Sequence, residues 1–253
     1  MNRHRKTKPA RSWLEWIREL QREVFMSTKP SALTDLMRSR RSPRAFLPTP
    51  LDPATIRGVL QDAQLAPSNS NTQPWVVHVV SGKARDTLSD NLLAANKDGR
   101  RSLDFMLDYG EGVHRQRAQQ HAAVHHGVRG IDRSDHEGRA EITRENLRFF
   151  GAPHAALLFM PMLGDGVRAA GDVGMYAQNF LLSLTARGFH GIPQAIISFY
   201  ADTVRESLGV PGDLKLLFGI AFGTADPVSP LKSLDLDKVP YEHSVVFHDD
   251  PCV

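Results

Sequence analysis

Cysteine is almost absent from this 253-residue sequence, and long apolar runs are missing altogether. The single Cys252 lies one residue from the C-terminus, which excludes an internal disulfide, a CxxC redox pair and a zinc site built from several cysteines. No apolar run approaches the roughly 18 residues that a membrane-spanning helix needs, so we expect no integral membrane segment. Scarce cysteine also fits a reducing compartment, and we expect a cytoplasmic protein.

The glycine-rich signatures of three large enzyme classes are missing too. The sequence contains no GxGxxG, no GxxxxGK[ST] and no GxSxG. A metal site has little support as well. His121 and His125 have the spacing that lets two imidazoles share one helix face. The Glu of HExxH and a third ligand are not evident, so the sequence favours a solvated helix face and no metal.

Positive and negative side chains are nearly equal in number, with 31 Lys and Arg against 28 Asp and Glu. This balance does not indicate nucleic-acid binding. Residues 1–11 nevertheless hold cations and no acidic residue, and an amphipathic helix is predicted over residues 13–25. We therefore interpret residues 1–30 as a basic and amphipathic extension, and residues 31–253 as the main domain.

Hydrophobic periodicity predicts helices and strands that interleave irregularly. Helices are expected over residues 31–40, 53–65, most of 83–150, 171–187 and 202–208. Buried strands are expected over residues 75–80, 155–160 and 214–222, with residues 191–195 as a loop or short strand and a β-like run at 244–247. The pattern indicates one mixed α/β or α+β domain.

Three arginines and a serine lie within Arg40-Arg41-Ser42-Pro43-Arg44. Pro43 disfavours helix at Ser42, so the segment is expected to be extended, with Arg40, Ser42 and Arg44 on one face. Guanidinium groups are planar, permanently charged and bidentate, which suits phosphate oxygens. A solvated basic helix end remains the alternative.

The segment from Pro67 to Pro74 is a polar loop with two Ser, two Asn, one Thr and one Gln. These side chains both donate and accept hydrogen bonds, as recognition of a heterocycle with amide-like edges requires. An ordinary polar loop is the alternative. Trp75 weakens it, because a tryptophan beside so polar a turn is costly unless both are buried together.

Taken in order, these segments resemble the nitroreductase family, the FMN-dependent NAD(P)H oxidoreductases. The resemblance covers roughly residues 31–247. It rests on the two motifs above and on further ones: Arg44-Ala45-Phe46, Phe149–Pro153, Gly171–Gly174 at the opening of the long helix, Gly191–Ala195, Phe218–Asp226 and Lys238-Val239-Pro240.

The resemblance implies a cofactor-binding role for individual residues. The FMN phosphate and ribityl chain would be clamped by Arg40, Arg41, Ser42 and Arg44, with Gly223 and Lys238 at the phosphate end. A loop reaching the flavin from the partner subunit would comprise Pro67, Ser68, Asn69 and Asn71. The flavin edge would be lined by Pro193, Gln194, Ala195 and Ile196. Relatives often carry Arg in place of Lys238, so phosphate binding is expected to depend more on Arg40 and Arg44.

The family fold is α+β, with a central, mostly antiparallel sheet wrapped by helices, in an interwoven homodimer with shared active sites and a C-terminal dimer arm. The implied reaction is ping-pong: NAD(P)H delivers hydride to flavin N5, and an electron-poor small molecule such as a nitroaromatic or quinone is then reduced. No catalytic side chain is expected, because the flavin carries the chemistry. Phe105 and Tyr109 would belong to a lid over the acceptor, with packing in the core as the alternative.

Two other readings of the same resemblance stay open. The protein could be a dehalogenase or a flavin-cleaving enzyme on this fold, or a flavin-binding protein with little turnover.

Overall fold

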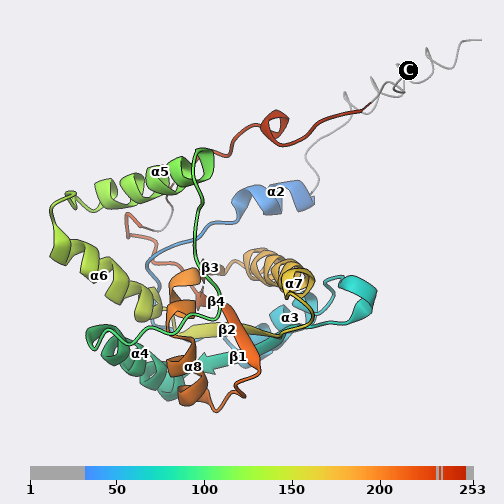
Figure 1. Ribbon diagram of the computed structural model, residues 1–253, viewed down its shortest axis with the longest axis horizontal. Helices are drawn as coiled ribbons and strands as arrows, with labels where there is room; N and C mark the ends of the chain where they lie inside the picture. The colour runs from blue at the N-terminus through green and yellow to red at the C-terminus, as the bar shows by residue number, and fades with distance from the viewer. Residues whose placement is uncertain (1–31, 232–233, 235, 249–253) are drawn as a thin grey trace, which may run out of the picture. The chain divides into compact units, whose positions relative to one another are not determined.

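The computed structural model describes residues 32–231, 234 and 236–248 (Figure 1). Contacts divide the chain into two units, residues 1–39 and residues 40–253. In the first unit, helix α2 (Ala32–Ser39) confirms the helix predicted over residues 31–40. The basic residues 1–11 and the helix predicted over residues 13–25 lie outside the described residues.

The second unit contains the predicted alternation of helices and strands. Its α-helices are α3 (Pro53–Ala63), α4 (Gly82–Lys97), α5 (Val113–Val128), α6 (His136–Leu147), α7 (Val167–Ala186) and α8 (Ala201–Leu208). Its strands are β1 (Val76–Ser81), β2 (His154–Pro161), β3 (His190–Gln194) and β4 (Leu214–Gly223). Short 3-10 helices are η1 (Asn69–Asn71), η2 (Phe149–Gly151), η3 (Ala195–Phe199) and η4 (Tyr241–His243).

These strands form one antiparallel sheet in the order β1-β2-β4-β3. Strand β2 lies inside the sheet and is buried from His154 to Met160. Because side chains alternate along a strand, Leu157 and Phe159 face one core, while Leu158 and Met160 face the other. A strand buried on both faces needs cover on both, and the predicted α+β fold with an antiparallel sheet is confirmed.

Helices cover the two faces of the sheet separately (Figure 1). α3 and α7 pack on the face of Leu158, where Phe180 of α7 meets Phe222 of β4 edge to face, with ring centroids 5.3 Å apart. α4 and α8 pack on the face of Leu157. None of the helices that the structure describes is long and apolar enough to cross a membrane.

Helix α7 begins at Val167, so the prediction that Gly171 opens it is wrong. Gly166 adopts a left-handed φ of 79° at the N-cap, and the Val167 amide donates to the Asp165 carboxylate at 3.1 Å. Gly171 and Gly174 lie within the helix, where nothing approaches the place of a Cβ. The turn at Asp165 and Gly166, and not the later glycines, therefore sets the start of the helix.

The β-like run at residues 244–247 forms no strand, so that prediction is also wrong for the single chain. The Val245 amide donates to the Tyr241 carbonyl at 2.9 Å and closes a turn after η4. Val246 and Phe247 remain 76% and 68% exposed. A strand needs a neighbour for its backbone amides, and no described strand pairs with this run.

A buried ion pair fixes the loop of residues 98–112 to the sheet. Arg205 of α8 donates to both oxygens of the Asp104 carboxylate, at 2.6 and 3.1 Å. The Leu216 amide, in β4, donates to the same carboxylate at 2.8 Å. The side chains of Asp104 and Arg205 are only 6% and 12% exposed. Residues 98–112 are therefore anchored at Asp104 from two elements.

We expect Asp104→Ala to lower the free energy of unfolding by about 3 kcal/mol, because it leaves the charge of Arg205 buried without its main partner. Urea denaturation measures the change. Asp86→Ala is the control: Asp86 also pairs with an arginine, Arg85, but its side chain is 63% exposed, so the loss should stay below about 1 kcal/mol. Equal losses would contradict the anchoring role.

A second buried polar group, His154 at the start of β2, is held neutral. The Leu51 amide donates to its Nε2 at 2.9 Å, and the Ser81 hydroxyl lies 2.5 Å from its Nδ1. The ring stacks on Phe222. Burial lowers the pKa of His154 below its ordinary value of 6.5. The folded state therefore binds this proton less readily than the unfolded chain does.

This difference predicts acid sensitivity. Neutral His154 contributes its full stabilisation to the folded state above pH 6.5, the ordinary pKa that its imidazole has in the unfolded chain. This contribution is lost as the pH falls towards the lower pKa that His154 has in the folded state. His154→Gln should therefore lose stability less steeply than the wild type between pH 7 and pH 5, measured by urea denaturation at several pH values. His136→Gln, at an exposed position of α6, should keep the wild-type slope. Identical slopes in both variants would count against this role for His154.

Candidate functional site

The arginine-rich segment predicted to bind phosphate lies beyond the end of β4. Phe46 forms an isolated antiparallel bridge with Ala225, and its amide donates to the Phe150 carbonyl at 3.2 Å. The Arg44 amide donates to the Leu231 carbonyl at 2.9 Å. The segment is thus extended, as expected from Pro43, and its backbone is held by three separate parts of the chain.

Arg40, Ser42 and Arg44 come together as predicted. The Arg40 guanidinium donates to the Ser42 hydroxyl at 3.1 Å, and the Arg44 guanidinium donates to the Ser42 carbonyl at 3.2 Å. Arg41 is exposed and donates to the Arg40 carbonyl. Arg41 therefore takes no part in the contacts that Arg40 and Arg44 make with Ser42, although its charge still acts on Arg40.

Arg40 and Arg44 are partly buried cations without an anionic partner among the described residues. Burial, followed by the nearness of Arg129, lowers the pKa of Arg44 to about 10, so the group still carries its charge at neutral pH. Burial and the charge of Arg41 lower the pKa of Arg40 as well. Desolvating a cation without pairing it is costly. These two side chains therefore fit an anionic ligand such as a phosphate.

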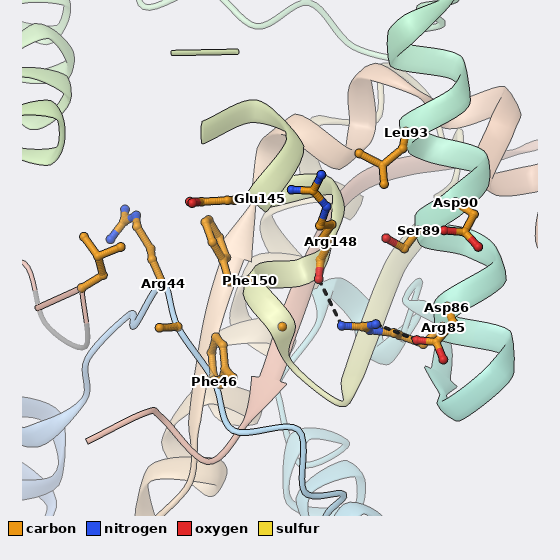
Figure 2. A pocket seen from close by; sticks show the side chains of 13 residues that line it. Arg44, Phe46, Arg85, Asp86, Ser89, Asp90, Leu93, Glu145, Arg148 and Phe150 are labelled. Atoms are coloured by element: carbon orange, nitrogen blue, oxygen red, sulfur yellow. Dashed lines mark hydrogen bonds and ion pairs between the residues drawn. The ribbon is translucent and has the colours of Figure 1, made fainter. Parts of the chain in front are cut away.

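A cavity of about 560 Å³ adjoins Arg44, within the size range of small-molecule sites. Figure 2 shows α4 with Arg85 on one side and Arg44 on the other, with Phe150 and Arg148 between them. Arg85 donates to the Ala152 and Arg148 carbonyls at 2.9 and 3.1 Å, which ties α4 to the turn that carries Phe150.

Sequence reasoning missed the residues of this turn. Phe149, Phe150 and Gly151 all have left-handed backbones, with φ of 56°, 54° and 77°. Two consecutive bulky residues in that conformation are rare, and such strain concentrates at functional sites. The turn brings Arg148 and Phe150 to the cavity, and Glu145 reaches it from α6. The Phe-Phe-Gly run was the available signal, but its spacing alone assigns no role to its neighbours.

Gln194 and Gly223 lie at different positions along the sheet, since Gly223 pairs with His190 and Gln194 pairs with Gly219. Gln194 is 3% exposed, and its Nε2 donates to the Asn146 carbonyl at 2.8 Å, while its Oε1 has no partner. A Cβ on Gly223 would meet the Pro153 ring at 2.7 Å, so only glycine fits there. Of the other residues predicted along the flavin edge, Pro193 and Ala195 are exposed and Ile196 is half-buried.

Orphaned polar atoms gather in the same region. The buried side-chain nitrogen and oxygen atoms without a hydrogen bond, within the described chain, belong to six residues: His125, Arg129, Arg139, Glu145, His190 and Gln194. All lie on α5, its C-cap, α6 or β3. Arg129 and Glu145 still form an ion pair, with atoms 2.5 Å apart. Buried polar atoms are normally satisfied, so a ligand or water is expected to meet those that have no partner within the chain.

The two histidines on α5 are not a solvated face, and that expectation is wrong. His125 is only 6% exposed, and His121 is half-buried. The Arg44 guanidinium lies 3.0 Å from the His121 Nε2. Burial, then the charges of Arg44 and Arg129, lower the pKa of His125 to about 3. No group of three His, Cys, Asp or Glu residues arranged to hold a metal occurs among the described residues.

The polar loop predicted to bind the flavin is held rigidly by α7 and by Trp75. The Asn69 amide donates to the buried Asp172 carboxylate at 3.1 and 3.2 Å, and Ser68 accepts from the Gln73 amide at 2.9 Å. Trp75 is buried, as expected, and stacks on Tyr176. The loop itself stays open, since Pro67, Asn69 and Asn71 are exposed.

The loop and the arginine segment do not meet within one chain. The loop precedes β1, whose first residue Val76 pairs with Phe159 near the end of β2. The arginine segment pairs just beyond Phe222, which faces His154 at the start of β2. Five residues of strand separate these places, or about 17 Å. One chain therefore carries the two groups of predicted flavin ligands at opposite ends of its sheet.

The remaining predicted residues are placed separately. Lys238 is exposed, and its charge acts on His121, which brings it near the arginine segment. Phe105 packs against the core on the α7 side of the sheet, in agreement with the alternative to a lid role. Tyr109 is 53% exposed and remains available to a ligand.

Comparison with known proteins agrees with this geometry. The family model described as "Nitroreductase family" matches residues 37–224. The chain is 43% identical to nitroreductase NfnB of Mycolicibacterium smegmatis over 80% of its own length and 87% of that protein, and 32% identical to 4-nitrobenzoate reductase of Pseudomonas putida, over 79% and 88%. It also resembles the crystal structure of the FMN-dependent nitroreductase NfnB from Mycobacterium smegmatis in complex with NADPH, with a TM-score of 0.83, 41% identity, and 86% and 98% of the two chains covered. The chain belongs to the nitroreductase family.

Proposed function

We propose that this protein is an FMN-dependent nitroreductase that uses NADPH to reduce nitroaromatic compounds. Relatives matched over about four fifths of the chain are named nitroreductase and 4-nitrobenzoate reductase, and a similar structure is described as FMN-dependent and in complex with NADPH. The observation that carries the proposal is the charge of Arg44, which is partly buried, lacks an anionic partner among the described residues and lies beside an open cavity. The alternatives, a dehalogenase, a flavin-cleaving enzyme or a mere flavin carrier, gain no support from these relatives.

The chemistry that FMN supplies when bound is transfer of hydride from the reduced nicotinamide to an electron-poor acceptor. The chain's own residues bind and orient. Arg40, Ser42 and Lys238 offer donors and positive charge for a phosphate. Arg44 brings a buried positive charge that favours a ligand gaining negative charge. Gln194 offers a buried acceptor, Oε1, for a ligand N–H.

The acceptor must approach from the side that the arginine segment leaves open. Tyr109 is exposed on the loop anchored at Asp104, where its ring can stack on a nitroarene. The ion pair between Asp104 and Arg205 holds that loop in place, and it thereby limits where the Tyr109 ring can lie. The choice of nitroaromatic compound would then depend on this loop more than on the residues that bind the cofactor.

We further propose a homodimer in which each flavin site takes the arginine segment of one subunit and the loop of residues 67–71 from the other. The separation of the two groups by much of the length of β2 supports this arrangement. The exposed residues Tyr241 and Phe247 fit an arm that packs on a second copy. A cytoplasmic location stays a prediction.

Loss of a charged contact should weaken cofactor binding. We expect Arg44→Ala to raise the Kd for FMN by roughly 10- to 150-fold, which corresponds to the loss of about 1.5–3 kcal/mol of a charge-assisted hydrogen bond. Flavin fluorescence titration of the apoprotein measures the Kd. Lys97→Ala removes a cation from the end of α4, away from the arginine segment, and should bind FMN like the wild type. Equal affinities in the two variants, or FAD as the bound flavin, would contradict the assignment.

The shared site can be tested by mixing two variants at an FMN concentration that saturates the wild type but lies well below the raised Kd of Arg44→Ala. Arg44→Ala damages the clamp, and Asn71→Ala damages the loop. In a shared-site heterodimer, one site carries both defects and the other carries none. Unfolding and refolding an equal mixture should therefore restore NADPH-dependent nitroarene reduction to roughly a quarter of the wild-type rate, since half of the dimers are mixed and each has one intact site.

Each variant refolded alone, at the same FMN concentration, is the control and should keep only residual activity. A mixture with no more activity than the separate variants would show that both groups serve the same chain's site, and would overturn the shared-site model.

A further inference from the structure

The contact between Arg44 and His121 allows only one assignment of hydrogen-bond donor and acceptor. The Arg44 guanidinium carries only donors, and its terminal nitrogen lies 3.0 Å from the His121 Nε2. Nε2 must therefore be the acceptor, which requires a neutral imidazole whose proton is on Nδ1. We propose that His121 is a positioning residue: it holds the Arg44 guanidinium in place for the anionic cofactor, and protonation of His121 releases that guanidinium.

This inference rests on the proposed function, in which Arg44 contacts FMN. A guanidinium has five N–H groups. In this structure one of them donates to the Ser42 carbonyl and one to His121, so three remain for a ligand. Two fixed contacts from different elements, the extended segment and α5, orient the planar group before the ligand arrives. Preorganisation of this kind removes part of the entropic cost of binding.

The charges around His121 are positive. Arg44 faces it from the extended segment and Lys238 from the C-terminal segment. His125 also lies on α5, and the charges of Arg44 and Arg129 act on it as well. Glu145 of α6 is paired with Arg129, and no described carboxylate forms an ion pair with His121. Burial, followed by the charges of Arg44 and Lys238, lowers the pKa of His121.

Protonation would change the contact in two ways. The imidazolium has no acceptor, so the hydrogen bond from Arg44 is lost. It also places a second cation within contact distance of a partly buried one, which repels it. Both effects move Arg44 away from α5. Cofactor affinity is therefore coupled to the charge of His121, although His121 need not touch the cofactor.

Two variants separate the acceptor from the shape of the side chain. His121→Gln keeps an acceptor and does not titrate, whereas His121→Phe keeps a ring and loses the acceptor. At pH 8 we expect the Kd for FMN to stay close to the wild-type value in His121→Gln and to rise roughly 10-fold in His121→Phe. His114→Gln, an exposed position on the same helix, is the matched control and should leave the Kd unchanged.

The pH dependence gives the second readout. Between pH 8 and pH 5.5 the ionisation of the FMN phosphate weakens binding in every variant alike. The wild type and His114→Gln should weaken more than His121→Gln, and the difference should grow as the pH falls towards the lowered pKa of His121, because only they protonate His121. NMR titration of His121 tests the same contact without relying on a ring substitution: Arg44→Ala should raise the pKa of His121, because it removes a neighbouring cation.

An unchanged Kd in His121→Phe at pH 8, or equal pH dependence in the wild type and His121→Gln, would overturn the inference. So would a His121 pKa that Arg44→Ala leaves unaltered. These outcomes differ from failure of the proposed function. If Arg44→Ala binds FMN like the wild type, the cofactor clamp itself is wrong. If Arg44→Ala loses FMN and His121→Phe does not, only the positioning role is wrong.

Discussion

The burial of β2 on both faces is the constraint on which the rest of the molecule depends. The run from His154 to Met160 is apolar apart from its first residue, and neither face reaches solvent. Helices must therefore cover both faces of the sheet, and they do so from opposite sides. With both faces of β2 covered, a ligand can reach the sheet only at the ends of its strands or along its edge strands, β1 and β3. The arginine segment lies beyond one end and the polar loop before the other, so the geometry of one strand favours a site completed by a second subunit.

The two ends of the sheet carry different chemical groups. The loop of residues 67–74 is fixed by neutral and anionic partners, among them Asp172, and presents exposed amide and hydroxyl groups. The opposite end gathers positive charge from Arg40, Arg44 and Lys238 around a partly buried region. In the proposed shared site, the phosphate of FMN would bind at the positively charged end, and its heterocycle would meet the polar loop of a second subunit.

Much of the fold could be predicted from the sequence, because it depends on periodicity. The continuous apolar run of β2 and the proline at the start of α3 are local signals for a buried strand and for a helix start. The start of α7 could not, because the Asp165 and Gly166 turn competes with two helical glycines that look like breaks. The residues 244–247 have strand composition, but pairing requires a neighbour that composition does not specify.

The site was predictable in part for the same reason. Arg40, Ser42 and Arg44 converge because an extended chain alternates, which spacing alone reveals. His121 shows the opposite case: four-residue spacing on a helix says that two histidines share a face, but not that the face meets Arg44, 77 residues earlier in the chain. Arg148 and Phe150 depend on a strained backbone, and strain has no reliable signature in composition.

A comparison of buried polar groups across the molecule separates structure from function. Where they serve the fold, they are satisfied: Asp104 accepts from Arg205 and Leu216, His154 is engaged at both nitrogens, and the Trp75 indole donates to Gln64. Around Arg44 the opposite holds, since the nearby elements α5, α6 and β3 carry the orphaned atoms of the described chain. A folded chain tolerates such costs at one place only if something bound there offsets them. Arg129 and Glu145 pair with each other, so the groups left to a ligand are a guanidinium N–H of Arg139, the Gln194 amide oxygen and one imidazole nitrogen each of His125 and His190. A ligand that satisfies them needs acceptors or negative charge for the first and hydrogen-bond donors for the amide oxygen. A flavin mononucleotide, with its phosphate and its imide N–H, meets both requirements.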